Sequence, residues 1–229
     1  MSGSENSPVP LLSSQVEKGA HVLARAMQHS PDMKYFIGDD SRMLETPAKR
    51  FYQSVICIGL IYGEVFTTPS MLGIAVWVSP EYNSFTFESM FRTGFLRAIL
   101  SMGFGSLWRF VRSSIFVEKL QKQAISVPHW TLVFIGVEPT HRGKGIGGNL
   151  IQPILARADS DGIPCYVESV DERNLTFYQR HGFEIVKDGQ VPNSGLQVWI
   201  LVRKPACATA SILLHSISSR NRAAGNFAR

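Results

Sequence analysis

The chain has 229 residues, which is enough for one domain with a buried core and too few for two full enzyme domains. Hydrophobic residues make up 45% and charged residues 18%, a globular composition that argues against disorder over most of the length. The net charge of +5 does not predict nucleic-acid binding, because Arg220, Arg222 and Arg229 supply +3 of it and no nucleic-acid-binding motif accompanies the basic residues.

The sequence shows no membrane-spanning or secretory pattern. The unbroken apolar runs, such as Val55 to Ile61, are too short to span a bilayer. The first ten residues hold no basic stretch followed by an apolar one, so we expect an intracellular, cytoplasmic protein. Three widely separated cysteines fit reduced thiols, and no Cys and His spacing typical of a metal site occurs, so we expect no bound metal.

The N-terminal third predicts two helices followed by two strands. Ser14 is a suitable N-cap for a helical pattern that stops at the Ser30–Pro31 step. A second helix is predicted to begin at Thr46 and to run through Ile58. Two short strands then form a predicted hairpin: Glu64 to Thr68 and Leu72 to Val78.

Residues 84–123 predict an inserted pair of amphipathic helices joined near Gly103. They hold seven of the fourteen phenylalanines, and the apolar residues recur at helical spacing: Phe87, Phe91, Phe95, Ile99, Leu107, Phe110, Val111 and Phe116. We expect these residues to be core, although they and Trp108 could line an apolar acceptor pocket. Basic residues on the same pair allow a second hypothesis, an interfacial membrane helix, but a solvated face is favoured.

After Pro128 the pattern indicates a mixed α/β arrangement without a regular repeat. The predicted elements are a strand at 130–137, a turn at 138–144, a helix at 145–160, a strand at 165–169, a short helix from Glu172, and strands at 183–191 and 196–203. From Pro205 onward the chain is rich in Ala, Ser and Arg, which predicts a flexible tail at 205–229. Residues 1–204 are therefore expected to form a single domain.

The turn between the predicted strand at 130–137 and the following helix has the composition of an anion site: Arg142-Gly143-Lys144-Gly145-Ile146-Gly147. Glycines let the backbone approach a diphosphate closely, and successive N–H groups point at it. The following helix contributes the positive end of its dipole. Arg142 and Lys144 add positive charge, so the segment predicts diphosphate binding.

Spacing separates the families that use such a turn. A P-loop requires Gly, four residues and then Gly-Lys-Ser/Thr, but Gly145 occupies the hydroxyl position and Gly136 lies too far upstream. The dinucleotide fingerprint is matched by Gly143, Gly145 and Gly148, yet residues 138–142 separate the strand from the first glycine. Only 81 residues follow Gly148, which is short for the strands and helices of a dinucleotide-binding fold, so nicotinamide binding is disfavoured.

The remaining family is the GNAT superfamily of N-acetyltransferases, whose Arg/Gln-x-x-Gly-x-Gly/Ala signature is met by Arg142, Gly145 and Gly147. The order and spacing of further segments resemble puromycin N-acetyltransferase and its relatives: Gly136-Val137-Glu138-Pro139, Val167-Glu168-Ser169, Arg173-Asn174, Phe177-Tyr178 and His181-Gly182-Phe183. Weaker similarity extends from Leu72 to Pro205, so the N-terminal residues and the tail are covered poorly.

This resemblance implies the GNAT fold and acetyl-CoA as cosubstrate. The implied fold is α/β, with flanking helices around a mixed, mostly antiparallel central sheet whose middle strands are splayed. A bulge in the strand at 131–137 would part it from the strand at 165–169 and leave a wedge for the pantetheine arm. The implied CoA-binding residues come from the first strand, the turn and the later short helix: Ile135, Gly136, Val137, Arg142, Gly143, Lys144, Gly145, Ile146, Gly147 and Asn174.

The resemblance also implies direct attack of an amine on the thioester, with two proton transfers. Tyr178 stands where the family places the general acid that protonates the departing CoA thiolate. Glu168, which ends its strand near the wedge, is a candidate general base, although a strand-end carboxylate is as often a structural hydrogen-bonding group. Glu64 and His129 are weaker candidates for the base.

The acceptor does not follow from the fold alone. Likeness to the puromycin enzyme favours a primary amine of a small molecule. Acetylation of a protein or peptide amine is an alternative, and so is a non-catalytic acyl-CoA-binding module. The sequence contains no indication of the oligomeric state.

Overall fold

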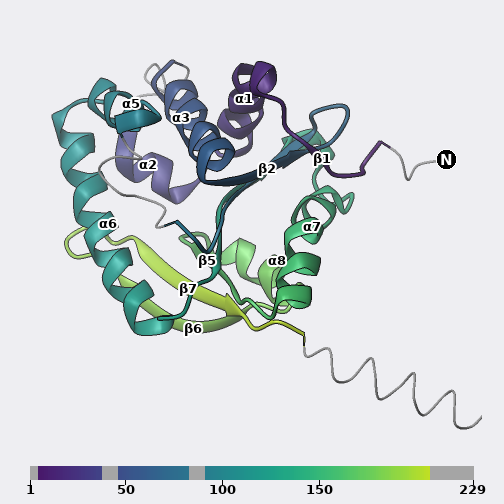
Figure 1. Ribbon diagram of the computed structural model, residues 1–229. Coiled ribbons are helices and arrows are strands. Elements are labelled where there is room, and N and C mark those ends of the chain that lie inside the picture. The colour runs from purple at the N-terminus through teal and green to yellow at the C-terminus, as the bar shows by residue number, and fades with distance from the viewer. Residues whose placement is uncertain (1–4, 38–45, 83–90, 207–229) are drawn as a thin grey trace, which may run out of the picture.

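The computed structural model describes residues 5–37, 46–82 and 91–206, which form a mixed α/β fold around one seven-stranded sheet (Figure 1). The strand order is β1-β2-β3-β4-β5-β7-β6, and only β4 and β5 pair in parallel. The strands are β1 (Val9–Pro10), β2 (Gly63–Thr67), β3 (Gly73–Val78), β4 (Trp130–Val137), β5 (Cys165–Ser169), β6 (Glu184–Gln190) and β7 (Gln197–Arg203). The prediction of a mixed, mostly antiparallel sheet flanked by helices is confirmed.

Seven described helices surround this sheet: α1 (Val16–Ala26), α2 (Pro31–Ile37), α3 (Thr46–Tyr62), α5 (Phe95–Ser101), α6 (Phe104–Ala124), α7 (Ile146–Asp161) and α8 (Leu175–Arg180). In the described ranges, 3-10 turns precede α1, α7 and α8: Ser13–Gln15, Pro139–His141 and Glu172–Asn174. Within the described ranges, no helix is both long and apolar enough to cross a bilayer.

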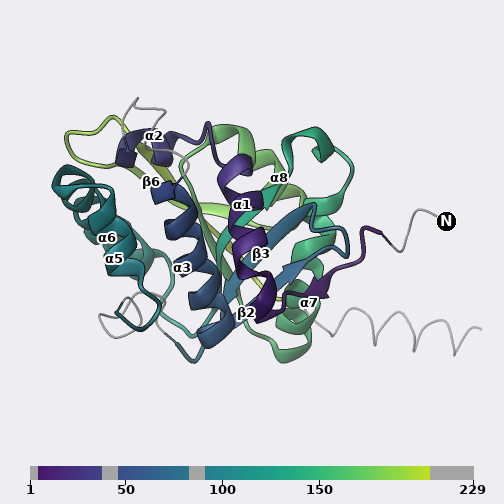
Figure 2. The same ribbon diagram turned by 90° about the horizontal axis from the view of Figure 1, so that it is seen from above.

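The central strand β3 is buried on both sides, because it separates two hydrophobic cores. Ile74, Val76 and Val78 pack with the helices α1 and α3, whereas Ala75 and Trp77 pack with α7. Successive side chains of a strand point to opposite faces, so one apolar run serves both cores. Figure 2 shows α1 and α3 side by side over one face of the sheet.

Of the predicted helical pair, residues 84–90 lie outside the described residues, and the described part contains α5 and α6. Phe95 is 1% exposed, and its ring centroid lies 5.3 Å from that of Phe51 in α3. The helix α6 follows one side of the sheet, where it contacts β6 and β7 (Figure 1). The expectation of core packing is therefore confirmed for the inner side of this pair.

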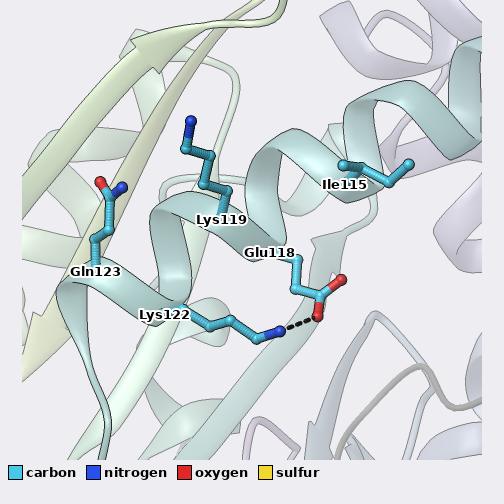
Figure 3. Close-up of a pocket in the computed structure, with 5 residues that line it drawn as sticks. All are labelled: Ile115, Glu118, Lys119, Lys122 and Gln123. Atoms are coloured by element: carbon cyan, nitrogen blue, oxygen red, sulfur yellow. Dashed lines mark hydrogen bonds and ion pairs between the residues drawn. The ribbon is translucent and has the colours of Figure 1, made fainter.

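The outer side of α6 is exposed, contrary to the expectation for some of its apolar residues. Phe104 is 84% exposed and Trp108 67%, and Val111 is also exposed, so these side chains line neither a core nor an acceptor pocket. Further along, a shallow hollow is lined by Ile115, Glu118, Lys119, Lys122 and Gln123, with a 2.6 Å ion pair between Lys122 and Glu118 (Figure 3). Because α6 alone forms this hollow, it contains no residue predicted to bind CoA.

Two elements were absent from the sequence prediction. The strand β1 has two residues, too few for an alternating pattern. The helix α2 begins at Pro31, where only the end of the preceding helix was predicted; proline is well tolerated at the first helical position. The helix α3 also extends four residues beyond the predicted Ile58, to Tyr62. Of the predicted tail, residues 207–229 lie outside the described residues.

Candidate functional site

The parallel strands β4 and β5 diverge in the middle of the sheet. Their ladder ends where Leu132 is opposite Val167, although β4 continues to Val137 and β5 to Ser169. At the point of divergence the register of β4 against β3 skips Val133, which forms a β-bulge. The predicted splaying and bulge are confirmed, and the edge of β4 beyond Leu132 has no ladder partner in β5.

The turn before α7 presents a run of amide groups without acceptors. Among the described residues, nothing accepts a hydrogen bond from the backbone N–H groups of residues 143–148. Gly145, with φ of 78°, is the N-cap of α7 and no side chain caps that helix. A Cβ atom added at Gly143 or Gly145 would meet nothing within 4 Å. Open space, unpaired amides and a helix N-terminus together fit a diphosphate.

The two cations of this turn have different surroundings. The Arg142 guanidinium donates from Nη2 to the Ala26 carbonyl at the end of α1 (2.5 Å) and from Nε to the Val137 carbonyl (3.4 Å). Lys144 is exposed in the turn. Arg142 therefore anchors the turn to α1 and β4 in addition to contributing charge, while Lys144 extends over the open side.

The helix α8 packs against the first turn of α7. A Cβ atom on Gly147 would lie 3.3 Å from the Phe177 ring, and one on Gly148 would lie 2.8 Å from Nε2 of His181. Only glycine permits this close approach without displacement of a neighbour. The contact brings Asn174, the exposed N-cap residue of α8, onto the same side of the fold as the amides of the turn.

Tyr178 projects from α8 into the region where the strands diverge. Its side chain is 6% exposed and its ring packs against Phe177 and Phe183, with centroids 5.3 and 6.0 Å away. Burial, and secondarily the nearby carboxylates of Glu168 and Asp32, raise the pKa of Tyr178. The phenol is therefore protonated at neutral pH.

Glu168 lies on β5, one residue beyond the end of the ladder with β4. Its side chain is open to solvent and accepts a hydrogen bond from the Tyr166 hydroxyl (3.0 Å). Desolvation by the surrounding wedge raises the pKa of Glu168 to about 7, an effect that Asp32 increases and the Tyr166 hydrogen bond partly offsets. A carboxyl with such a pKa can accept or release a proton near neutral pH.

The two weaker base candidates are engaged elsewhere. Glu64, on β2, forms an ion pair with Arg157 of α7. His129 contacts the Val127 carbonyl (2.7 Å) and the Gln121 side chain (3.1 Å), at the paired end of β4 rather than the splayed end. Glu168 is close enough to Tyr178 to raise its pKa, whereas Glu64 and His129 are engaged with other residues.

One acidic residue near the site was missed by the sequence analysis. Asp32, in the first turn of α2, is close enough to raise the pKa of Glu168, Tyr178 and Tyr52. It belongs to no motif, and the helix that carries it was not predicted. Only knowledge of the fold could have identified this residue. Among the described residues, no group of three or more potential ligands could hold a metal ion.

Comparisons with known proteins agree with this geometry. A family model described as an acetyltransferase (GNAT) domain matches residues 99–185, which include β4, the turn, α7, β5 and α8. An uncharacterized N-acetyltransferase of Schizosaccharomyces pombe is 26% identical over 160 residues, which are 67% of this chain and 65% of the relative. The chain thus spans slightly less than two thirds of the length of that relative.

Solved structures share the fold at low sequence identity. A histone acetyltransferase HPA2 and related acetyltransferase from Corynebacterium glutamicum is similar with a TM-score of 0.61 at 17% identity, over 89% of this chain and 98% of that one. A polyamine N-acetyltransferase of Drosophila melanogaster, which forms N-acetylagmatine, is similar with a TM-score of 0.57 at 16% identity, over 86% and 98%. The sheet and these matches show that the chain has the fold of GNAT acetyltransferases and is similar in sequence to the GNAT domain over residues 99–185.

Proposed function

We propose that the protein is an acetyl-CoA-dependent N-acetyltransferase that acetylates a primary amine of a small molecule. The strongest support for this proposal is that the expected binding and proton-transfer groups lie close to one another. A glycine turn with unpaired amides lies beside splayed strands, and next to both lie a protonated phenol, Tyr178, and a carboxyl, Glu168, that titrates near neutral pH. Cosubstrate binding and both proton transfers have candidate groups in one place.

The cosubstrate acetyl-CoA supplies an acetyl group activated as a thioester. In the proposed complex, the amides of residues 143–147 bind its diphosphate, with Arg142 and Lys144 adding charge. Backbone groups of Ile135, Gly136 and Val137, on the edge of β4 that β5 leaves unpaired, hold the pantetheine arm, and Asn174 contacts CoA from α8. One N–H of this edge stabilises the developing oxyanion.

The proposed reaction starts from the protonated amine and releases one net proton. Glu168 takes a proton from the acceptor ammonium, and the neutral amine attacks the thioester carbonyl. The C–N bond forms, the C–S bond breaks, and Tyr178 donates its proton to the departing thiolate. The nitrogen loses its second proton as the amide forms, and a proton from solvent restores the phenol. The products are an acetamide, CoA as the free thiol and one proton.

The test of this function is release of CoA thiol from acetyl-CoA across panels of small amines, aminonucleosides and peptides, with products identified by mass spectrometry. We expect an added mass of one acetyl group on a small primary amine. Acetylation of peptides alone would replace the proposed acceptor class. Binding of acetyl-CoA in calorimetry without thiol release from any acceptor would instead indicate a non-catalytic acyl-CoA-binding module.

A further inference from the structure

The outer side of α6 is apolar over the first half of the helix, although the solvent-exposed side of a helix is normally polar. Its exposed apolar residues follow one another at steps of four, three and four positions, so they lie along one line of the helix: Phe104, Trp108, Val111 and Ile115. Leu100 of the neighbouring helix α5 is exposed as well. We name the four residues of α6 the outer stripe.

The outer stripe is not needed for the packing of α6 against the rest of the protein. Other sides of the helix already contact the cores. Leu107 and Phe110 pack against the cluster that contains α3, and Leu120 belongs to the cluster that contains β7. The stripe is therefore additional apolar surface, and a continuous apolar area on a protein surface marks an interaction site.

The segment that carries the outer stripe is strongly basic. Residues 91–123 hold six cations and one acid, a net charge of +5 that equals the net charge of the whole chain, so the remaining residues are neutral in sum. Lys119 and Lys122 lie four and seven positions after Ile115 and continue the line of the stripe toward the end of α6 (Figure 3). The single acid, Glu118, pairs with Lys122 at 2.6 Å, which leaves the excess of positive charge.

This charge distinguishes between the possible occupants of the outer stripe. A second copy of the chain docked on the same side would bring together two segments that each have a net charge of +5, and like charges across an interface repel. An anionic lipid bilayer carries the opposite charge. Trp and Phe side chains are favoured at the headgroup level of a bilayer, where lysine side chains can extend their ammonium groups to the phosphates.

We propose that α6 binds along the surface of an anionic lipid bilayer, with the outer stripe among the headgroups and with Lys119 and Lys122 at the lipid phosphates. Figures 1 and 2 show α6 and α7 on opposite sides of the molecule, so the turn before α7 stays open in this orientation. The interaction is additional to the proposed function and does not depend on it.

The test is co-sedimentation of the full chain with two kinds of vesicle, phosphatidylcholine alone and phosphatidylcholine mixed with phosphatidylserine. We expect binding to the mixed, anionic vesicles and about tenfold weaker binding, or less, to the neutral ones. Trp108 is exposed, whereas Trp77 and Trp130 are buried. The tryptophan emission should therefore shift to shorter wavelength with the anionic vesicles, as Trp108 leaves water.

Variants of exposed residues test which surface binds. Trp108→Ser should weaken binding to the anionic vesicles by about tenfold, because it removes a large ring from the interface. Leu12→Ser is the matched control, since Leu12 is 61% exposed and Trp108 67% and Leu12 lies outside α5 and α6, and it should bind as wild type. Lys119→Glu combined with Lys122→Glu should reduce the preference for anionic over neutral vesicles. Far-ultraviolet circular dichroism of all variants should match wild type.

Three results would overturn the proposal: no binding of the wild type to anionic vesicles, equal affinity for both kinds of vesicle, or wild-type affinity in Trp108→Ser, which would assign binding to other basic residues of the chain. Sedimentation equilibrium without vesicles tests the other occupant. Self-association that Trp108→Ser abolishes, without vesicle binding, would assign the outer stripe to a second copy of the chain and also overturn the proposal. None of these results bears on acetyl-CoA turnover, so the proposed function is tested separately.

Discussion

At the scale of single residues, the site contains two ionisable groups whose surroundings differ in a useful way. Tyr178 is buried among aromatic rings, whereas Glu168 lies at a strand end that solvent reaches. Desolvation raises the pKa of both groups, which keeps the phenol protonated and brings the pKa of the carboxyl to about 7. One group is thus suited to donate a proton and the other to exchange one near neutral pH.

Replacement of Tyr178 by phenylalanine should separate binding from chemistry. The ring would still fill the space between Phe177 and Phe183, but the thiolate would lose its proton donor. We expect kcat to fall by roughly 10²-fold or more while the Kd for acetyl-CoA changes less than about twofold. Steady-state kinetics with calorimetry measures both values, and an unchanged kcat would remove Tyr178 from the mechanism.

The pH profile should report the carboxyl of Glu168. A general base must be deprotonated, so kcat/KM should be low below its pKa of about 7 and rise as the pH increases through that value. The groups nearest to this carboxyl are Asp32 and the hydroxyl of Tyr166. In Glu168→Gln the rise near 7 should disappear, leaving only the increase due to deprotonation of the amine itself. Retention of that rise in the variant would assign it to another group.

At the scale of elements, the two ends of α7 offer a matched pair of glycines. Gly145 at the N-terminus and Gly162 at the C-terminus have φ of 78° and 69°, and a Cβ atom at either would meet nothing within 4 Å. Valine at either position should therefore cost a similar strain of about 1–2 kcal/mol. Only Gly145 lies where the diphosphate is proposed to bind.

Gly145→Val should consequently weaken acetyl-CoA binding by about tenfold or more, because a side chain would occupy the approach of the diphosphate. Gly162→Val should lose comparable stability and keep wild-type affinity. Calorimetry and denaturant unfolding of both variants measure these quantities. Equal affinities in the two variants would contradict the assignment of the turn.

The helices and strands that could be predicted are those whose sequence signals lie within a few neighbouring residues. The strand β4, the glycine turn and α7 each carry an apolar run or a capping signal within a few residues, and the predicted strand 130–137 matches β4. The helix α2 has seven residues and packs against α6, which is distant in sequence. Such an element has no local signal, because its contacts exist only after folding.

The difference between local and long-range signals also explains which site residues could be predicted from the sequence. Gly145, Asn174 and Tyr178 follow one another within a continuous motif, so their resemblance to the GNAT family could be recognised from spacing. Asp32 lies 136 residues before Glu168, on an element that the motif does not include. The proposed CoA-binding residues could therefore be named from the sequence, whereas Asp32 could be found only from the fold.

At the scale of the whole molecule, the packing of α5 and α6 against the rest of the core determines whether the chain unfolds in one cooperative transition. Phe95 of α5 is packed between Phe51 of α3 and Phe110 of α6, with ring centroids 5.3 Å away in both cases. Phe51 in turn belongs to the core that contains Ile74 and Val76 of β3. The inserted pair thus shares its core with the sheet, which predicts a single cooperative transition.

Phe95→Ala should therefore destabilise the entire domain, by about 3–5 kcal/mol, since it leaves a cavity between three helices. Phe104→Ala, on the exposed side of α6, removes the same ring from a side chain that is 84% exposed and should change the free energy of unfolding by less than about 0.5 kcal/mol. Denaturant unfolding followed by tryptophan fluorescence and by far-ultraviolet circular dichroism measures both variants. Coincident curves, shifted only in Phe95→Ala, are expected; two separate transitions would show that the inserted pair unfolds independently of the sheet.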